Sequence, residues 1–505
     1  MGSRARSAER ELIFVSLAAY RDPELVPTVR DCLDKARHPD RLRFGICWQH
    51  GADETLPEWI DGEQFRVIDV DYRDSEGANW ARAQVMSLFA DEDWYLQLDS
   101  HHRFARDWDT LLTDEFASLP TQRAILTSYG PPYSPDDPDA AEDVPMSMAF
   151  RIFTTDGLPL FVPTPVTAGP GEGPRPARFA SAHLLFAPAS FVRDVPVDPE
   201  LYFNGDEAML AVRAYTHGYD LYEPSRTIVW HHYDRPTAKH WDDHDGGETA
   251  WWARDSGSRA KMRRIFEEST VEPLGLGSAR TLADYEAYAG IDLRRCLVQD
   301  YTRQHRVPPN PAAAPDWPLT MSHHVVTIEL DDEHVTPEAL DGVDYWHLAV
   351  RDADGRDLHQ REIPAAELGR TVLTVEFESQ ATPHTWTVTP RRRDSTWLAP
   401  ITGDVRDRRS VRLDARRPRR TAGVRWLSNG DRLVASLPGQ AGPDRELNST
   451  GALLVEMADG AHSIREIASF LKEDHGLADD PVSDIHDFYE SARSAGLVTM
   501  GSHDG

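Results

Sequence analysis

Short apolar runs alternate with stretches of helical periodicity over the first third of the chain. Five of these runs have the length and composition of buried strands, at residues 12–17, 42–48, 65–72, 94–98 and 124–129. Helical spacing of apolar side chains appears between the first two runs, over residues 25–36, and again over 77–90 and 108–119. Elements in this order predict an α/β layer with a mainly parallel sheet. The turn at residues 99–101 would then lie beyond the carboxyl end of a strand, where open α/β sheets bind ligands.

The middle of the chain is less regular. Residues 130–173 are rich in Pro, Gly and Asp and show little periodicity, which predicts long loops over the sheet, suited to a substrate lid. Regular structure is expected again over residues 179–186, in a helix over 203–217 and in a strand over 227–230. The tryptophan-containing segment 241–266 fits either ordinary amphipathic helix packing or a role on the acceptor side.

The last two fifths of the chain have the pattern of smaller domains. The proline-rich segment VPPNPAAAPDWP predicts a semi-rigid linker. Beyond it, apolar and polar residues alternate as in an antiparallel β-domain, at residues 325–330, 345–350, 371–378 and 385–389. A hairpin within 424–437 and helices over 449–457, 464–473 and 483–495 then predict a winged-helix-like α+β domain. We therefore expect five parts, namely a first domain (1–306), a linker (307–318), a β-sandwich-like domain (319–405), a basic linker (406–422) and a C-terminal domain (423–500).

Composition narrows the class of protein. With 505 residues, 40% hydrophobic and 27% charged, the chain is expected to form a soluble globular protein of two to four domains. A net charge of -30 at pH 7 repels phosphate backbones and argues against a nucleic-acid partner. The absence of an apolar run of about 18 residues and of a signal segment argues against a membrane and for the cytoplasm. Cys32, Cys47 and Cys296 show no CxxC pairing and are expected to be reduced thiols.

The charge is unevenly distributed. Between Arg391 and Arg420 the chain has eleven arginines and four aspartates, a basic island in an acidic protein. Such a run is more often a linker or a solvated face than a binding site. The alternative is attraction of an acidic peptide.

The sequence Asp99-Ser-His101 carries the central chemistry. If the backbone stays extended after the apolar run at 94–98, side chains two positions apart point to the same side and can reach one ion together. Mn²⁺ or Mg²⁺ accepts carboxylate and diphosphate oxygens, and Mn²⁺ tolerates imidazole better, so the pair favours manganese. Taken alone such a triplet arises often by chance on surfaces. No GxxxxGK[ST] or GxGxxG is present, so neither a P-loop nor a dinucleotide site is supported.

Several longer motifs give this triplet its context. In order they are IFVSLAAYRDPEL, GANWAR, LQLDSHHRF, FNGDE, THGYDLYEP and WHHYDR. With them the chain resembles, over about residues 11–270, the cytoplasmic polypeptide N-acetylglucosaminyltransferase family, which are retaining enzymes of the hydroxyproline-modifying type with a GT-A fold. It is more distantly similar to the mucin-type polypeptide GalNAc-transferases. The resemblance implies transfer of a sugar, GlcNAc first, from a UDP-sugar with the help of Mn²⁺ or Mg²⁺.

The resemblance also implies roles for individual residues. Asp99, His101 and His231 match the metal ligands, although His231 or His232 alone would more often be a hydrogen-bonded loop histidine. Asp206 and Glu207 fall at paired acids near the donor sugar, where the family more often has Glu at the first position; a helix start capped by Asn204 is the alternative. The other matched positions contact the nucleotide or its diphosphate, or assist departure of UDP: Tyr20, Arg21, Asp22, Gly77, Arg82, Asp99 and Arg235. An exposed arginine in a surface salt bridge is the alternative for Arg82.

The C-terminal segment has a resemblance of its own. NSTGALLVEMADGAHSIREIASFL and DIHDFYESARSAGLV look like the PqqD-like domain that recognises precursor peptides in ribosomal peptide modification. This implies that an extended leader peptide adds to a hairpin edge within 424–437. The expected acceptor is a Ser, Thr or Cys side chain of a precursor peptide. The alternatives are glycosylation of a folded cytosolic protein, or a peptide-binding protein whose transferase fold has lost activity.

Overall fold

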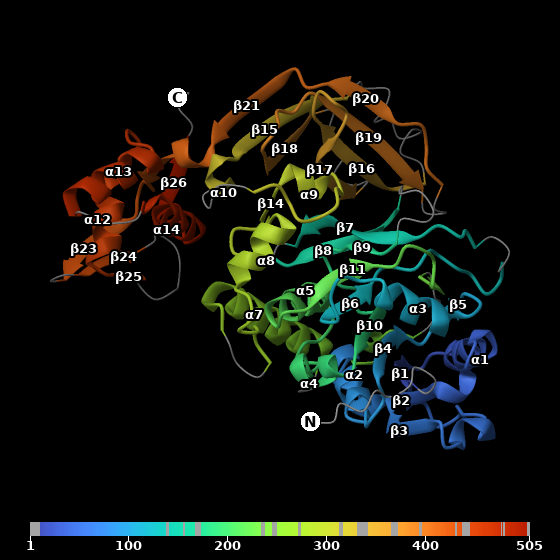
Figure 1. Ribbon diagram of the computed structural model, residues 1–505. Coiled ribbons are helices and arrows are strands. Elements are labelled where there is room, and N and C mark those ends of the chain that lie inside the picture. The colour runs from blue at the N-terminus through green and yellow to red at the C-terminus, as the bar shows by residue number, and fades with distance from the viewer. Residues whose placement is uncertain are drawn as a thin grey trace. The chain divides into compact units, whose positions relative to one another are not determined.

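The computed structural model divides the chain into two compact units (Figure 1). They comprise Met1–Cys296 with Tyr301–Pro311, and Leu297–Asp300 with Ala312–Gly505. The break after Pro311 falls within the segment 307–318 that we expected to be a linker. The residues described are 11–137, 141–154, 157–166, 173–233, 238–244, 250–270, 274–312, 317–330, 342–364, 372–392, 396–429, 432–436, 445–475, 477 and 480–501.

The first unit is built on an eight-stranded mixed sheet. The strand order is β3-β2-β1-β4-β10-β6-β11-β9. β1 pairs in parallel with β2 and β4, whereas β10 is antiparallel to β4 and β6. All five strands predicted from the apolar runs are present, and the predicted α/β class is confirmed. The strands are β1 (Ile13–Tyr20), β2 (Leu42–His50), β3 (Phe65–Asp71), β4 (Trp94–Asp99), β6 (Ala124–Thr127), β9 (Arg175–Pro176), β10 (Leu184–Pro188) and β11 (Asp220–Glu223).

Helices cover this sheet through their apolar faces (Figure 1). Leu25, Val29 and Cys32 of one helix and Trp108 and Leu112 of another join the strand side chains in one buried cluster. Burying each such side chain stabilises the fold by about 1.5–3 kcal/mol. Cys32 and Cys47 are buried, Cys296 is half-buried, and all three are free thiols. The helices of this unit are α1 (Leu25–Lys35), α2 (Ala78–Met86), α3 (Trp108–Ala117), α4 (Ser190–Asp194), α5 (Asp206–Thr216), α6 (His240–Asp243), α7 (Trp251–Glu268) and α8 (Leu282–Ala289).

The expectation of loops throughout residues 130–173 is wrong. β7 (Met146–Phe153) and β8 (Pro159–Pro165) form an antiparallel hairpin within this segment. Prolines in β8 hide its strand pattern, and a two-stranded sheet tolerates them because each strand has an unpaired edge. The segment 241–266 is mainly helical, with most of α6 and of α7, and its acceptor-side alternative stays open.

The second unit contains the predicted antiparallel strands. β15 (Ser322–Glu329) lies between β18 (Val372–Ser379) and β21 (Asp407–Arg412). β16 (Val343–Arg351) lies between β17 (Asp357–Pro364) and β19 (Thr385–Arg392), which in turn pairs with β20 (Ile401–Asp404). Apolar side chains from both sheets form one core that includes Trp346, Val326 and Phe377.

The interpretation of residues 406–422 as a basic linker is wrong. This segment contains β21 and β22 (Arg417–Arg420), and β22 pairs with β26 (Val498–Gly501). Several of its arginines bind acids of the same unit, as Arg412 does with Asp414 and Arg416 with Glu490. The charges therefore belong to folded structure.

The C-terminal part has the predicted hairpin and helices around a second apolar cluster. β23 (Arg425–Asn429) pairs with β24 (Arg432–Ser436), which pairs with β25 (Arg445–Leu447). The helices are α10 (Trp317–Thr320), α12 (Ser449–Met457), α13 (Ile464–His475) and α14 (Val482–Ser494). The division into three domains stays a prediction. Among the described residues, none of the helices combines the length and the hydropathy needed to cross a lipid bilayer.

Candidate functional site

Asp99, His101 and His231 come together at the carboxyl end of β4. β4 ends at Asp99, and β5 (His102–Phe104) pairs with β12 (Val229–His231), so that His231 lies opposite His102. One ligand atom from each of the three residues lies within 4.8 Å of the others. The Nε2 atoms of His101 and His231 lie 3.6 and 3.5 Å from Oδ2 of Asp99. Residues more than 130 positions apart therefore face one point.

This donor set fits a divalent cation. One carboxylate and two imidazoles suit Mn²⁺ and other borderline ions. The two nitrogen–oxygen distances exceed the range of a good hydrogen bond, as expected of ligands that surround a common position. Burial alone would raise the pKa of Asp99, but His231, Arg82 and His101 outweigh it and hold the pKa well below its usual value. The carboxylate therefore stays charged, as a metal ligand must be.

Asp22 lies behind His101. Its side chain is fully buried, and its Oδ2 accepts hydrogen bonds from Ser100 Oγ (2.6 Å) and from His101 Nδ1 (2.8 Å). A carboxylate bound to one imidazole nitrogen fixes the tautomer and leaves the other nitrogen for a metal. The expected contact of Asp22 with uracil or ribose stays a prediction, and the bond to His101 is a role that the sequence did not indicate.

A cavity of about 310 Å³ opens in front of these residues. This size lies within the range of small-molecule sites. Six residues that we predicted for the donor or the metal contribute to its wall: Tyr20, Asp22, Gly77, Arg82, Asp99 and His101. Aromatic side chains not predicted for the site complete it, among them Tyr202, Tyr233, His240 and Trp241.

Arg82 connects Asp99 of the candidate metal site with Asp206 at the start of α5. It is only 6% exposed, so the alternative of a surface salt bridge is excluded. Its guanidinium donates to Asp99 Oδ1 (3.1 Å) and to Asp206 Oδ2 (2.8 Å). Gly77, the N-cap of α2, has φ +115° and ψ -178°, a region that only glycine adopts readily. A Cβ there would lie 2.8 Å from the ring of Tyr202, so glycine is also required by space.

Asp206 and Glu207 begin α5 but have different partners. The N-cap is Gly205 with φ +87°, so the alternative of a helix start capped by Asn204 is wrong. Asp206 accepts from Asn79 and Arg82, whereas Glu207 accepts from the Tyr129 hydroxyl and from the backbone N–H of Ala182. Burial raises the pKa of both carboxyls, and the charge of Asp206 helps to raise that of Glu207 to about 8. Asp206 is thus paired with the Arg82 guanidinium, whereas the raised pKa of Glu207 lets this carboxyl hold a proton.

Tyr20 and Arg21 both bind α6. The hydroxyl of Tyr20 donates to Asp243 (2.8 Å), and Arg21 donates to both oxygens of the same carboxylate. Tyr20 contributes to the cavity wall, whereas Arg21 is not among its lining residues. Arg235, which we expected to assist departure of UDP, lies outside the described residues.

The sequence analysis missed several residues of the site. The ring of His183 stacks on that of His231, with centroids 4.2 Å apart and 13° between the planes, and its Nε2 accepts from Gly130 N–H. Tyr129, Tyr202 and Asp243 were missed as well. His183, Tyr129 and Tyr202 lie outside the strands and helices, and Asp243 ends the short helix α6, so no sequence signal pointed to them.

Comparisons with protein families and with solved structures found several similarities. The model of a family described as "Glycosyltransferase (GlcNAc)" matches residues 12–61 and 54–295. Among solved structures, the chain is similar to GalNAc-T7 with UDP, GalNAc and Mn²⁺ (TM-score 0.39, 11% identity, covering 85% of this chain and 76% of that one). It is also similar to S. aureus TarS 1–349 (TM-score 0.31, 10% identity, 51% and 72%) and to its complex with UDP-GlcNAc (TM-score 0.30, 11% identity, 51% and 73%).

No curated protein sequence matches the chain at a significant level. The family model nevertheless spans more than half of the 505 residues and includes Asp99, His101, His231, Asp206 and Glu207. The chain therefore belongs to the GlcNAc glycosyltransferase family and is a glycosyltransferase.

Proposed function

We propose that this glycosyltransferase is a metal-dependent, retaining enzyme of the GT-A type that takes its sugar, GlcNAc first, from a UDP-sugar. The convergence of Asp99, His101 and His231 on one point carries the proposal, and two of the three, Asp99 and His101, line the cavity. Asp22, fixed behind His101, supports it, because a buried carboxylate–imidazole pair is typical of metal sites. The three free cysteines are compatible with the cytoplasm, where thiols stay reduced.

The residues of the cavity suggest how transfer proceeds. Asp99, His101 and His231 would hold Mn²⁺ or Mg²⁺, which supplies positive charge for the departing diphosphate. Arg82 keeps Asp99 and Asp206 in fixed positions and contributes a second positive charge. Gly77 lets α2 begin against the cavity, with its positive end toward the donor.

Retention of configuration requires either an enzyme carboxylate as nucleophile or attack by the acceptor on the same face as the departing UDP. Asp206 and Glu207 are the proposed catalytic carboxylates. Asp206 is bound to Arg82, which keeps it close to the metal-ligand cluster. Glu207, with its raised pKa, can hold a proton near neutral pH. Arg235 belongs to the proposal on the family resemblance alone.

The proposed acceptor is a Ser, Thr or Cys side chain of a ribosomally made precursor peptide, held by a PqqD-like C-terminal domain. The three-stranded sheet β23-β24-β25 ends in an edge strand, β23, to which an extended peptide could add. Leu427 on β23 and Phe470 on α13 are 61% and 54% exposed and offer apolar contacts. Tethering would raise the local concentration of the acceptor.

Release of UDP from UDP-GlcNAc, measured with and without Mn²⁺, tests the donor and metal parts of the proposal. In Asp99→Asn we expect release to fall at least about 100-fold, because the carboxylate ligand is lost while the side-chain shape is kept. The variant should stay folded, because Arg82 keeps its bond to Asp206.

Asp69→Asn is the matched control, since that carboxylate is 72% exposed and belongs to a surface pair with His50. Wild-type release independent of metal, or full activity of Asp99→Asn, would disprove the assignment. Mass spectrometry of a candidate peptide, incubated with a panel of UDP-sugars, identifies donor and acceptor residue. Binding of UDP and Mn²⁺ without turnover of any donor would favour the inactive peptide-binding protein.

A further inference from the structure

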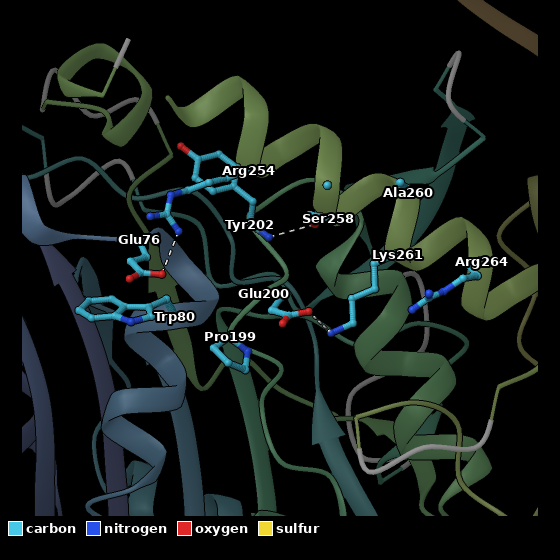
Figure 2. A pocket seen from close by; sticks show the side chains of 11 residues that line it. Glu76, Trp80, Pro199, Glu200, Tyr202, Arg254, Ser258, Ala260, Lys261 and Arg264 are labelled. Carbon is cyan, nitrogen blue, oxygen red and sulfur yellow. Dashed lines mark hydrogen bonds and ion pairs between the residues drawn. The ribbon is translucent and has the colours of Figure 1, made fainter. Parts of the chain in front are cut away.

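A second and larger cavity lies in the first unit next to the donor cavity (Figure 2). Its volume is about 660 Å³. Three segments line it: the start of α2 with Glu76 and Trp80, the loop from Pro199 to Tyr202, and one face of α7 with Gly257 and Lys261. The family resemblance assigns no role to this cavity, and α7 is the segment for which the sequence left an acceptor-side role open.

The two cavities share a wall. Tyr202 lines both, and Glu76 lines the second while the next residue, Gly77, lines the first. The backbone N–H of Tyr202 donates to Ser258 Oγ of α7 (3.0 Å), and its hydroxyl bonds to His240 Nδ1 of α6 (2.7 Å). A molecule that fills the second cavity therefore lies beside whatever occupies the donor cavity.

Gly257 lines this cavity without a side chain. It lies inside α7, where glycine destabilises a helix relative to alanine. Packing does not require it, because a Cβ at this position would meet nothing within 4 Å, whereas a Cβ at Gly205 would collide with Leu158. Because Gly257 lines the cavity, any larger side chain there would occupy it. The glycine thus has a cost to the helix that the cavity explains.

The chemistry of the wall limits the occupant. Trp80, Pro199 and the Tyr202 ring offer apolar surface, and four of the five charged side chains at the cavity form two ion pairs, while the fifth, Arg264, lies at the same wall. Arg254 binds Glu76 (2.8 Å), and Lys261 binds Asp198 and Glu200 (both 2.7 Å), as the dashed lines in Figure 2 show for Glu76 and Glu200. At Arg254 and Lys261 a phosphate would have to break these pairs. An apolar side chain needs no polar partner and gains by leaving water.

We propose that this cavity binds an apolar side chain of the acceptor peptide, at a position flanking the residue that receives the sugar. The inference rests on the proposed function, since it takes the neighbouring cavity as the donor site. It makes the enzyme selective for the sequence around the acceptor hydroxyl or thiol, by a site within the transferase unit.

Two substitutions on consecutive residues of α7 test the cavity. Gly257→Trp fills it, and Ser256→Trp places the same side chain at an exposed position that does not line it. Both are compared with wild type on short synthetic peptides that carry a single threonine, serine or cysteine flanked either by leucine or by glycine. Release of UDP without peptide, which does not involve the cavity, reports on the donor site.

We expect wild type and Ser256→Trp to prefer the leucine-flanked peptides by about tenfold or more in kcat/KM, the effect of burying one leucine. Gly257→Trp should lose that preference through KM and keep its UDP release. An undiminished preference in Gly257→Trp, no preference in wild type, or no modified peptide despite UDP release would overturn the inference. Absence of UDP release in wild type would instead contradict the proposed function. If wild type releases no UDP, calorimetry can still measure how the leucine-flanked peptides bind to wild type, Ser256→Trp and Gly257→Trp. Binding to Gly257→Trp as tight as to wild type would exclude the cavity as the peptide site.

Discussion

At the scale of single residues, the site shows which side chains the fold brings together, and the sequence alone does not reveal all of them. Asp99 and His101 could be predicted from their spacing at the end of an apolar run. His231 required the family resemblance, because more than a hundred residues separate it from them. Asp22 follows the first strand, where a nucleotide contact was expected, and only the fold reveals its bond to His101. Sequence spacing reports which residues share a strand, but it does not report which strands meet.

Asp22→Asn is expected to lower the affinity for Mn²⁺ by about 10- to 100-fold, the usual effect of removing a carboxylate behind a metal-bound histidine. The ligands themselves remain, so part of the turnover should survive at saturating Mn²⁺. Titration calorimetry measures the affinity. Glu115→Gln is the control, because it removes another buried carboxylate, bound to Ser225 and Arg226. An unchanged affinity in Asp22→Asn would show that Asp22 does not position His101.

The raised pKa of Glu207 predicts that the free energy of unfolding depends on pH. Its pKa is raised from 4.5 to about 8 by burial and by Asp206, so the folded chain holds this proton more tightly than the unfolded chain. The stabilisation is complete below pH 4.5 and is lost as pH rises toward 8. Relative to Glu207→Gln, the free energy of unfolding of wild type should fall across this window, by at most about 1.4 kcal/mol per pH unit. Denaturant titrations of both proteins without metal measure it, and parallel curves would disprove it.

At the scale of elements, the apolar pattern predicted strands correctly where most of the strand's side chains are buried in the sheet. Four of the five strands, β1, β2, β4 and β6, were found because they are mostly buried and have continuous apolar runs, whereas β3 is a half-exposed edge strand. The hairpin β7–β8 was missed because its prolines resemble those of a loop. β21 and β22 were missed because arginines, usually solvated, are paired there with acids, as Arg412 is with the nearby Asp414 and Arg417 with the distant Glu466. Both errors concern strands that are stabilised by their pairing with other segments and whose own sequences lack the usual alternation of apolar and polar residues.

At the scale of the whole molecule, the described residues of the candidate site all belong to the first unit. A chain ending at Pro311 should therefore keep Mn²⁺-dependent release of UDP. Transfer to a precursor peptide should fall by about 100-fold or more if the second unit holds the leader, because the effective concentration of the acceptor is lost. Initial rates of both reactions, with circular dichroism as a check of folding, measure this. Full-length Asp99→Asn gives the background, and undiminished transfer by the shortened chain would show that the second unit does not hold the substrate.

Tyr202 has a consequence for both substrates at once. Its ring separates the two cavities, and its hydroxyl bonds to α6, which is bound in turn to Tyr20 through Asp243. Any occupant that displaces this ring changes the free energy of the neighbouring compartment. Thermodynamic linkage then makes the influence mutual: whatever factor the nucleotide sugar imposes on peptide affinity, the peptide imposes on nucleotide-sugar affinity. Under the proposed assignment of the two cavities, one phenol would thus couple the binding of donor and peptide.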